Sequence, residues 1–333
     1  MSPATLKELF AHTDWARDRA FELVRGLLDE QLDRPFEMGI GSIRNTLHHI
    51  WAAERVWLDR WTKGGQPPFT FPEADIPIAT LLDRFTSTAA ERDAVVAGKC
   101  DAELAKPLTF TNIKGETYSL PLAGQMMHVA NHGIHHRAQL VNMLRHVGGP
   151  LPKMGLDYIF FRLEQPGTPP LELDALRTYQ AYSDWATCKL LFIASKLSDE
   201  QLDRRFEMGI GSIRDTLAHL CDAENWWYWN WTQGPGKAFP TQREKLPIAE
   251  LSRQLDEAWS NRDHFAGGLK DADLQRTVHA QPRPDRRVSF PLGVTMIQLC
   301  GHATHHRAQI LNMLRHVGAE TPALDLVLWL REQ

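Results

Sequence analysis

The segment NHGIHHRAQLVNMLRHVG spans residues 131–148, and a near-copy, GHATHHRAQILNMLRHVG, spans residues 301–318. In an α-helix, with about 100° between successive residues, His132 lies within about 40° of His136. The same stripe contains four apolar residues, Val129, Leu140, Met143 and Val147. Such a stripe faces the core in an amphipathic helix. The second segment repeats the pattern, so we expect two long helices that each direct a histidine pair at a core.

The rest of the chain is duplicated as well. DEQLDRPFEMGIGSIR at 29–44 returns as DEQLDRRFEMGIGSIR at 199–214, with 15 of 16 residues identical and an offset of 170 residues. A segment rich in turn residues, QPGTPPLE at 165–172, lies where the first copy ends. We therefore expect three parts in the chain: a first domain at 1–165, a linker at 166–172 and a second domain at 173–333.

Helical periodicity within the first copy predicts four long helices, at about 3–28, 42–61, 76–97 and 121–148. Before the fourth, LTFTNIKGETYSL at 108–120 places β-branched and aromatic residues around a Lys-Gly turn, which is typical of a short β-hairpin. A short segment at 155–164, or at 323–331 in the second copy, is expected to close the bundle of its own copy. The predicted fold class is all-α, with two tandem four-helix bundles.

The composition excludes several classes of function. The chain has 333 residues and a formal net charge of -4, whereas a protein that binds nucleic acid needs an excess of basic residues on its surface. No apolar run approaches the roughly 20 residues of a membrane span, so we expect neither nucleic acid nor a membrane as partner. The N-terminus has no apolar signal segment, and the four cysteines have no regular spacing. Both features favour a cytoplasmic protein with free thiols.

Two core-facing imidazoles four residues apart can bind one metal ion, because their side chains lie one above the other on the helix. A pair of this kind alone is more often two packed core histidines. Here the pair occurs in both copies, and the second predicted helix adds a third histidine, His49 or His219. His49 lies near the edge of the apolar stripe of that helix, whereas His48 points away from it and is expected in solvent.

Three neutral imidazoles from two helices suit Zn²⁺ or Ni²⁺ best, with iron or manganese as further options. Three protein ligands leave a coordination position for water or substrate, which is the arrangement of a catalytic centre. We therefore predict one divalent metal ion per domain.

Together, these motifs resemble the DinB/YfiT superfamily. The resemblance rests on TLHHIWAAERVWLDRW (46–61), TLAHLCDAENWWYWNW (216–231), the NHGIHHRAQ and GHATHHRAQ segments, the Asp-Trp pair of the first helix, and the terminal segments LDYIFFRLEQ and LDLVLWLREQ. It covers nearly the whole chain, twice. It implies two four-helix bundles that each hold a divalent metal ion through three histidines: His49, His132 and His136, then His219, His302 and His306.

Members of this superfamily commonly form homodimers. The resemblance therefore implies that the duplication makes a dimer within one chain, with pseudo-twofold symmetry, and that the whole chain is a monomer. Better-characterised relatives include metal-dependent transferases and isomerases that use low-molecular-weight thiols such as bacillithiol and mycothiol. A small-molecule substrate, such as a thiol of this kind, is the partner that the resemblance implies.

Two classes of function remain open. In the first, the protein is a metal-dependent hydrolase or thiol transferase, in which the metal activates water or a thiol. The candidates to orient the histidines or to take part in the chemistry are Glu54, Arg137, Asp157, Glu224, Arg307 and Asp325, although a structural ion pair explains the two arginines equally well. In the second, the protein is a non-catalytic binding module of the stress response, because its sequence shows no unambiguous general base or nucleophile.

Overall fold

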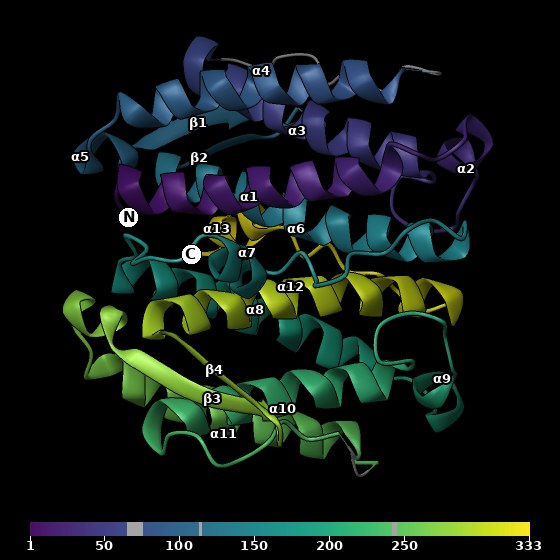
Figure 1. The fold of residues 1–333 in the computed structure, drawn as a ribbon, viewed down its shortest axis with the longest axis vertical. Helices are drawn as coiled ribbons and strands as arrows, with labels where there is room; N and C mark the ends of the chain where they lie inside the picture. The colour runs from purple at the N-terminus through teal and green to yellow at the C-terminus, as the bar shows by residue number, and fades with distance from the viewer. Residues whose placement is uncertain (65–75, 113–114, 242–244) are drawn as a thin grey trace. The chain divides into compact units, whose positions relative to one another are not determined.

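The computed structural model describes residues 1–64, 76–112, 115–241 and 245–333, and helices make up most of it (Figure 1). The long helices of the first copy are α1 (Pro3–Val24), α3 (Ile43–Lys63), α4 (Ile78–Ala97) and α6 (Leu122–His146). Those of the second copy are α8 (Leu173–Ala194), α10 (Ile213–Thr232), α11 (Ile248–Gly267) and α12 (Leu292–His316). The all-α prediction is confirmed.

Local chemistry explains where these helices begin. Ser42 accepts a hydrogen bond from the Asn45 N–H over 3.1 Å, and Ser212 accepts one from the Asp215 N–H over 3.1 Å. Each hydroxyl satisfies an amide that has no partner within the first turn of α3 or α10. Pro121 directly precedes α6, where the lack of a proline N–H costs nothing.

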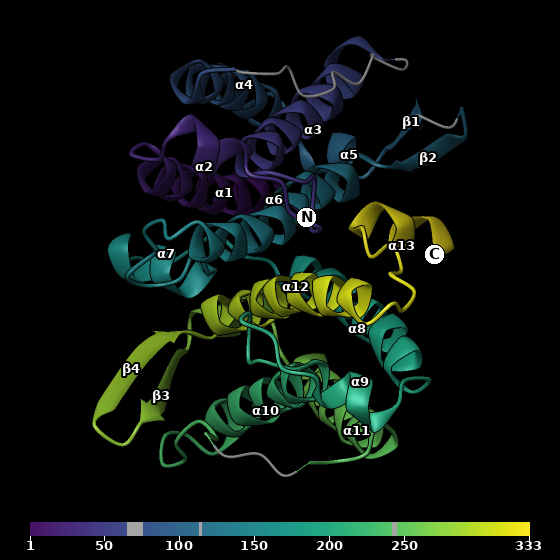
Figure 2. The ribbon, with the colours of Figure 1, turned by 90° about the vertical axis from the view of Figure 1, so that its right-hand side faces the viewer.

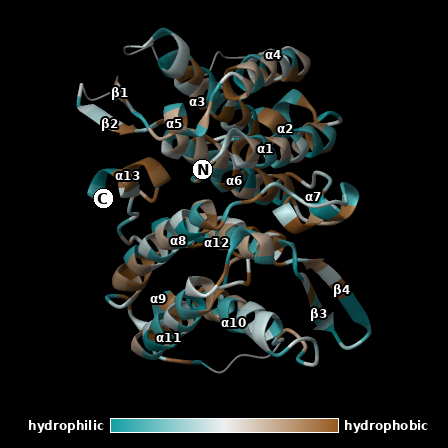
Figure 3. Cartoon of the chain, turned by 90° about the vertical axis from the view of Figure 1, so that its left-hand side faces the viewer, coloured by the Kyte–Doolittle hydropathy of each residue, from teal (hydrophilic) through white to brown (hydrophobic). Residues whose placement is uncertain are grey.

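In each copy the four long helices form a bundle. In the first, α1 and α3 each contact both α4 and α6; in the second, α8 and α10 each contact both α11 and α12. Figure 3 shows hydrophobic and hydrophilic stretches alternating along these helices, as amphipathic helices require. Leu47, Phe85 and Leu140 are buried together in the core of the first bundle. This packing fixes the face of α6 that points inward.

Shorter elements complete each bundle. They are α2 (Asp29–Asp33), α5 (Asp101–Leu104), α9 (Asp199–Asp203) and the 3₁₀ helix η1 (Asp271–Gln275). The two strands of the expected hairpin are present as antiparallel β1 (Pro107–Thr111) and β2 (Thr117–Pro121), with Leu108 opposite Leu120, whereas Lys114 of the expected turn lies outside the described residues. Its counterpart is β3 (Thr277–Arg283) with β4 (Arg286–Pro291), and each hairpin extends outward from its own bundle (Figure 2).

The two closing segments are exchanged between the copies. The first compact unit comprises Met1–Leu156 and Asp325–Gln333, and the second comprises Asp157–Leu324. Accordingly, α7 (Tyr158–Glu164) packs on α12, and α13 (Leu326–Glu332) packs on α6. The colours of Figure 1 make the exchange visible, since the yellow α13 lies beside the teal α6. The expectation that each copy is closed by its own short segment is therefore wrong.

The fit of α13 on α6 is close. A Cβ atom added to Gly124 of α6 would lie 2.7 Å from Leu330 Cδ1, so a larger residue there would have to displace the leucine side chain. Trp329 of α13 and Phe161 of α7 occupy equivalent positions and are both buried. The sequence predicts a short closing segment at each of these places, but it does not determine which bundle the segment covers. The expected boundaries at 165 and 173 thus follow the sequence repeat, whereas the compact units follow the exchange.

Every helix in the described part of the chain is too short or too polar to cross a bilayer.

Candidate metal centres

Two groups of three histidines each form a cluster. His49 of α3 meets His132 and His136 of α6, and His219 of α10 meets His302 and His306 of α12. Within each group, one nitrogen per ring lies within 4.8 Å of the nitrogens of the other two. The structure thus brings together, in two sets, the six histidines selected from the sequence. Their ligation of a metal stays a prediction.

The geometry of the nitrogens fits a metal ion. His49 Nε2 lies 3.3 Å from His132 Nε2, and His136 Nε2 lies 3.1 Å from the same atom. In the second group, His219 Nε2 lies 2.8 Å from His302 Nε2. Tetrahedral zinc with bonds of about 2.0–2.1 Å places its ligand nitrogens about 3.3 Å apart. Both distances from His132 Nε2 therefore match the spacing of a zinc site, and the distance in the second group is shorter.

The surroundings of four of these six imidazoles favour the neutral form. Burial lowers the pKa of His49 to about 4. The pKa values of His132, His136 and His306 lie well below the usual value, because burial penalises the charged ring and the neighbouring histidines add to the effect. A neutral imidazole offers a lone pair to a metal, whereas a protonated one does not. The donor set therefore fits a divalent metal ion at neutral pH.

Comparison with known families agrees with this geometry. The sequence profile of the DinB family matches residues 1–168 and again residues 172–333. The chain belongs to the DinB family. The two matches cover nearly the whole sequence, so it contains two tandem DinB domains, and the two histidine triads lie at equivalent places in them. No curated protein and no solved structure matched in the other two comparisons.

A glutamine that the sequence reasoning missed orients one histidine in each DinB domain. Gln139 Oε1 lies 2.8 Å from His136 Nδ1, and Gln139 Nε2 lies 3.0 Å from His135 Nε2. Because an amide oxygen only accepts, the proton of His136 is on Nδ1, and its Nε2 lone pair points to the triad. Gln309 makes the same two contacts, with His306 and His305, at 2.7 and 2.9 Å.

The loop before α3 packs on this glutamine. Gly39 has a φ of 53°, and a Cβ atom there would lie 2.6 Å from Gln139 Oε1. Asn142 Nδ2 of α6 also contacts Met38 Sδ over 3.4 Å. Gly209 and Met208 make equivalent contacts with Gln309 and Asn312. The near-identity of 29–44 and 199–214 was the sequence signal that could have revealed this contact, because each segment contains the glycine that packs on the glutamine.

A carboxylate contacts the second triad. Asp157 Oδ2 lies 3.3 Å from His302 Nδ1 and accepts a hydrogen bond from Gln298 Nε2 over 3.0 Å. Burial alone would raise the pKa of Asp157, but the contact with His302 and the nearby imidazoles outweigh burial and lower that pKa. In the first triad, Asp325 opposes the effect of burial on the pKa of His49. Both aspartates thus act on histidines of the other sequence copy.

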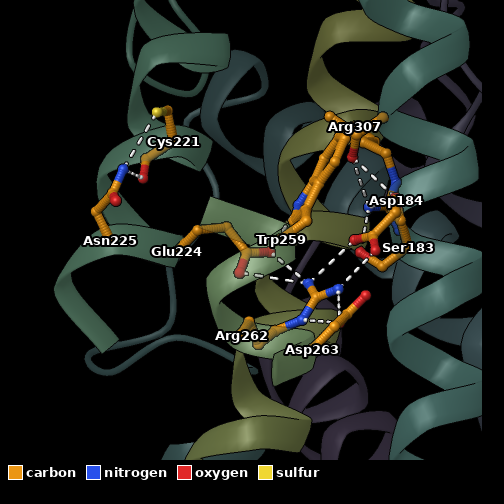
Figure 4. A network of polar contacts seen from close by, with 10 residues as sticks. Ser183, Asp184, Cys221, Glu224, Asn225, Trp259, Arg262, Asp263 and Arg307 are labelled. Atoms are coloured by element: carbon orange, nitrogen blue, oxygen red, sulfur yellow. Dashed lines mark hydrogen bonds and ion pairs between the residues drawn. The ribbon is translucent and has the colours of Figure 1, made fainter. Parts of the chain in front are cut away.

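Three of the remaining four candidates bond to partners outside the triads. Glu224 lies 3.3 Å from Arg262 Nη1, which also contacts Asp184, inside the second bundle (Figure 4). Glu54 is 3.6 Å from the equivalent Arg92. Arg307 donates to Ser183 Oγ over 2.8 Å and to Thr304 Oγ1 over 2.8 Å. These contacts join helices of one bundle, which gives all three residues structural roles.

Three other residues need comment. Arg137, the fourth candidate, is buried on α6. His48, expected in solvent, is fully buried, with its ring against Trp51 at 5.3 Å between centroids. The expectation for His48 was wrong because α3 is covered by α4 as well as by α6. His128 is also buried, and its ring packs against Trp57.

Proposed function

We propose that the protein is a metal-dependent enzyme with two centres, each of which holds one divalent metal ion through three histidines. The observation that carries the proposal is the convergence of three imidazole nitrogens from two helices in each DinB domain. A set of three protein ligands is the donor set of catalytic rather than structural zinc sites. His302 keeps 22% of its side chain exposed, which provides access for a small molecule.

A divalent metal ion bound there would lower the pKa of a water molecule or of a low-molecular-weight thiol. The chain itself supplies the three ligands and the glutamine that holds one ligand in the right tautomer. We propose hydrolysis of an ester or amide, in which water is added across the bond, or transfer of a thiol sulfur to an electrophilic carbon, whose leaving group departs with the thiol proton. Zinc or nickel suits the nitrogen donors best, and iron or manganese is a further option.

Metal content is the first test. The intact protein is expected to bind two equivalents of Zn²⁺ or Ni²⁺ per chain, measured by elemental analysis after gel filtration. His136→Ala and His306→Ala should each retain one equivalent, and the double variant none. Two equivalents in the double variant would rule out both histidine centres.

Turnover is the second test. Metal-loaded protein and the double variant are compared on a panel of esters, amides and thiol–electrophile pairs. We expect turnover of at least one pair that depends on metal and is lost in the double variant. The alternative is a non-catalytic module braced by its metal. Metal binding without turnover across the panel, together with Co²⁺ spectra that do not respond to azide or small thiols, would favour that alternative.

A further inference from the structure

The second metal centre contains a carboxylate that comes from the first sequence copy. Asp157 precedes α7, which belongs to the second compact unit. Its Oδ2 lies 3.3 Å from His302 Nδ1, while His302 Nε2 lies 2.8 Å from His219 Nε2. A proton on Nδ1 therefore points to the carboxylate, and the Nε2 lone pair points to the triad.

Gln298 holds this carboxylate in place. Its Nε2 donates to Asp157 Oδ2 over 3.0 Å, and its Oε1 accepts from the backbone N–H of Ile159 over 2.9 Å. Because Gln298 lies one helical turn before His302 on α12, a single helix positions both the imidazole and its carboxylate. The side chain of Asp157 is 17% exposed, so the contact is largely shielded from water.

The first centre differs at the equivalent position. His128 stands where the second copy has Gln298. Its ring packs edge-on against Trp57 at 5.3 Å between centroids and lies 5.7 Å from the ring of His132. An aromatic contact thus takes the place of the amide that anchors Asp157. The two centres share their predicted ligand types, but they differ in the groups that surround His132 in the first and His302 in the second.

We propose that Asp157 is a positioning residue for His302, and that it makes the second centre the tighter of the two metal sites. The inference rests on the metal binding proposed above. A carboxylate that accepts the second N–H of a ligand histidine fixes the orientation of the ring and raises its basicity. Loss of such a partner typically weakens metal affinity by about 10- to 100-fold. The exchange of α7 therefore makes the second centre depend on the first copy.

Single-centre variants of the full chain test the proposal. His136→Ala leaves the second centre intact and His306→Ala leaves the first, and Zn²⁺ affinity is measured by competition with a chromophoric chelator. We expect the second centre to bind about 10- to 100-fold more tightly than the first. In the His136→Ala background, Asp157→Asn should weaken Zn²⁺ binding at the second centre by about the same 10- to 100-fold factor. The matched Asp325→Asn, in the same background, should leave the affinity of the second centre unchanged.

A purely structural role of Asp157 predicts a different result. Circular dichroism verifies folding, and the Co²⁺ absorption spectrum of the second centre reports its ligand field. We expect Asp157→Asn to shift that spectrum and Asp157→Glu, which keeps the carboxylate, to restore most of the affinity.

If Asp157→Asn fails to fold, Asp157→Glu and Gln298→Leu decide the matter, since the first should bind more tightly than the second. Equal affinities of the two centres, or an unchanged spectrum and affinity in Asp157→Asn, would overturn this inference alone. Absence of metal from both single-centre variants would instead contradict the proposed function.

Discussion

Gln139 Oε1 lies 2.8 Å from His136 Nδ1, and the pair recurs as Gln309 and His306 at 2.7 Å. The amide oxygen can accept a hydrogen bond only from the tautomer that carries its proton on Nδ1. That tautomer leaves the lone pair of Nε2 free. Each glutamine is three residues after its histidine on the same helix, so the orientation is built into α6 and α12. In both triads this contact thus directs the Nε2 lone pair toward the other two histidines.

Replacing this glutamine should weaken one centre and spare the other. In Gln139→Leu, His136 loses its acceptor, and we expect the metal affinity of the first centre to fall by about 10- to 100-fold. The measurement is Zn²⁺ competition in the His306→Ala background, where only the first centre remains. Gln309→Leu in the same background is the matched control, and it should leave the affinity unchanged. An unaltered affinity in Gln139→Leu would show that the glutamine has no part in metal binding.

Gly39 should be required for both stability and metal binding. An alanine at its φ of 53° costs about 1–2 kcal/mol, and its Cβ would also displace Gln139. Gly148 has a similar φ of 67° but open space around it, so Gly148→Ala measures the backbone cost alone. We expect similar losses of unfolding free energy in urea titrations of the two variants, with reduced metal affinity only in Gly39→Ala. Equal affinities would mean that the loop does not support the glutamine.

The exchange of the closing helices gives two paired predictions. Phe161→Ala removes a buried ring from α7 and costs about 3–5 kcal/mol in the unit that α7 covers. Amide hydrogen exchange followed by mass spectrometry should therefore speed up in α12 and remain unchanged in α6. Trp329→Ala on α13 should do the reverse. If Phe161→Ala instead loosened α6, each short helix would be packing on its own sequence copy.

Sequence patterns revealed the repeated parts of this molecule and missed its long-range pairings. The apolar stripe around His136 predicted the buried face of α6, and residues 108–120 predicted the hairpin, because both signals are local. The places of α7 and α13 depend on contacts between residues over a hundred positions apart, such as Gln298 with Asp157. Short helices carry no local signal for their partner. The burial of His48 was missed for a similar reason. The prediction assumed that only one face of α3 is covered, whereas α3 contacts α4 as well as α6.

The buried cluster around Arg262 predicts how stability depends on pH. Burial raises the pKa of Glu224 to about 7, against the attraction of Arg262, and that of Asp184 to about 6 (Figure 4). Unfolded glutamate titrates near pH 4.5. Between about pH 4.5 and 7, Glu224 thus keeps a proton in the folded protein that it releases in the unfolded chain. The free energy of unfolding therefore falls as the pH rises through this range.

Glu224→Gln should reduce this dependence to the part that Asp184 contributes, because a neutral amide replaces one of the two groups that hold a proton. We expect a flatter plot of unfolding free energy against pH between pH 4.5 and 7, measured by urea titration of metal-free protein. Above pH 7 the variant should be at least as stable as the parent, since it no longer buries a charge. Arg262→Met provides the contrast: it leaves the carboxylates of Glu224 and Asp184 without their guanidinium, and should cost about 3–5 kcal/mol. A Glu224→Gln variant that lost stability most steeply at high pH would show that Glu224 is charged in the folded protein.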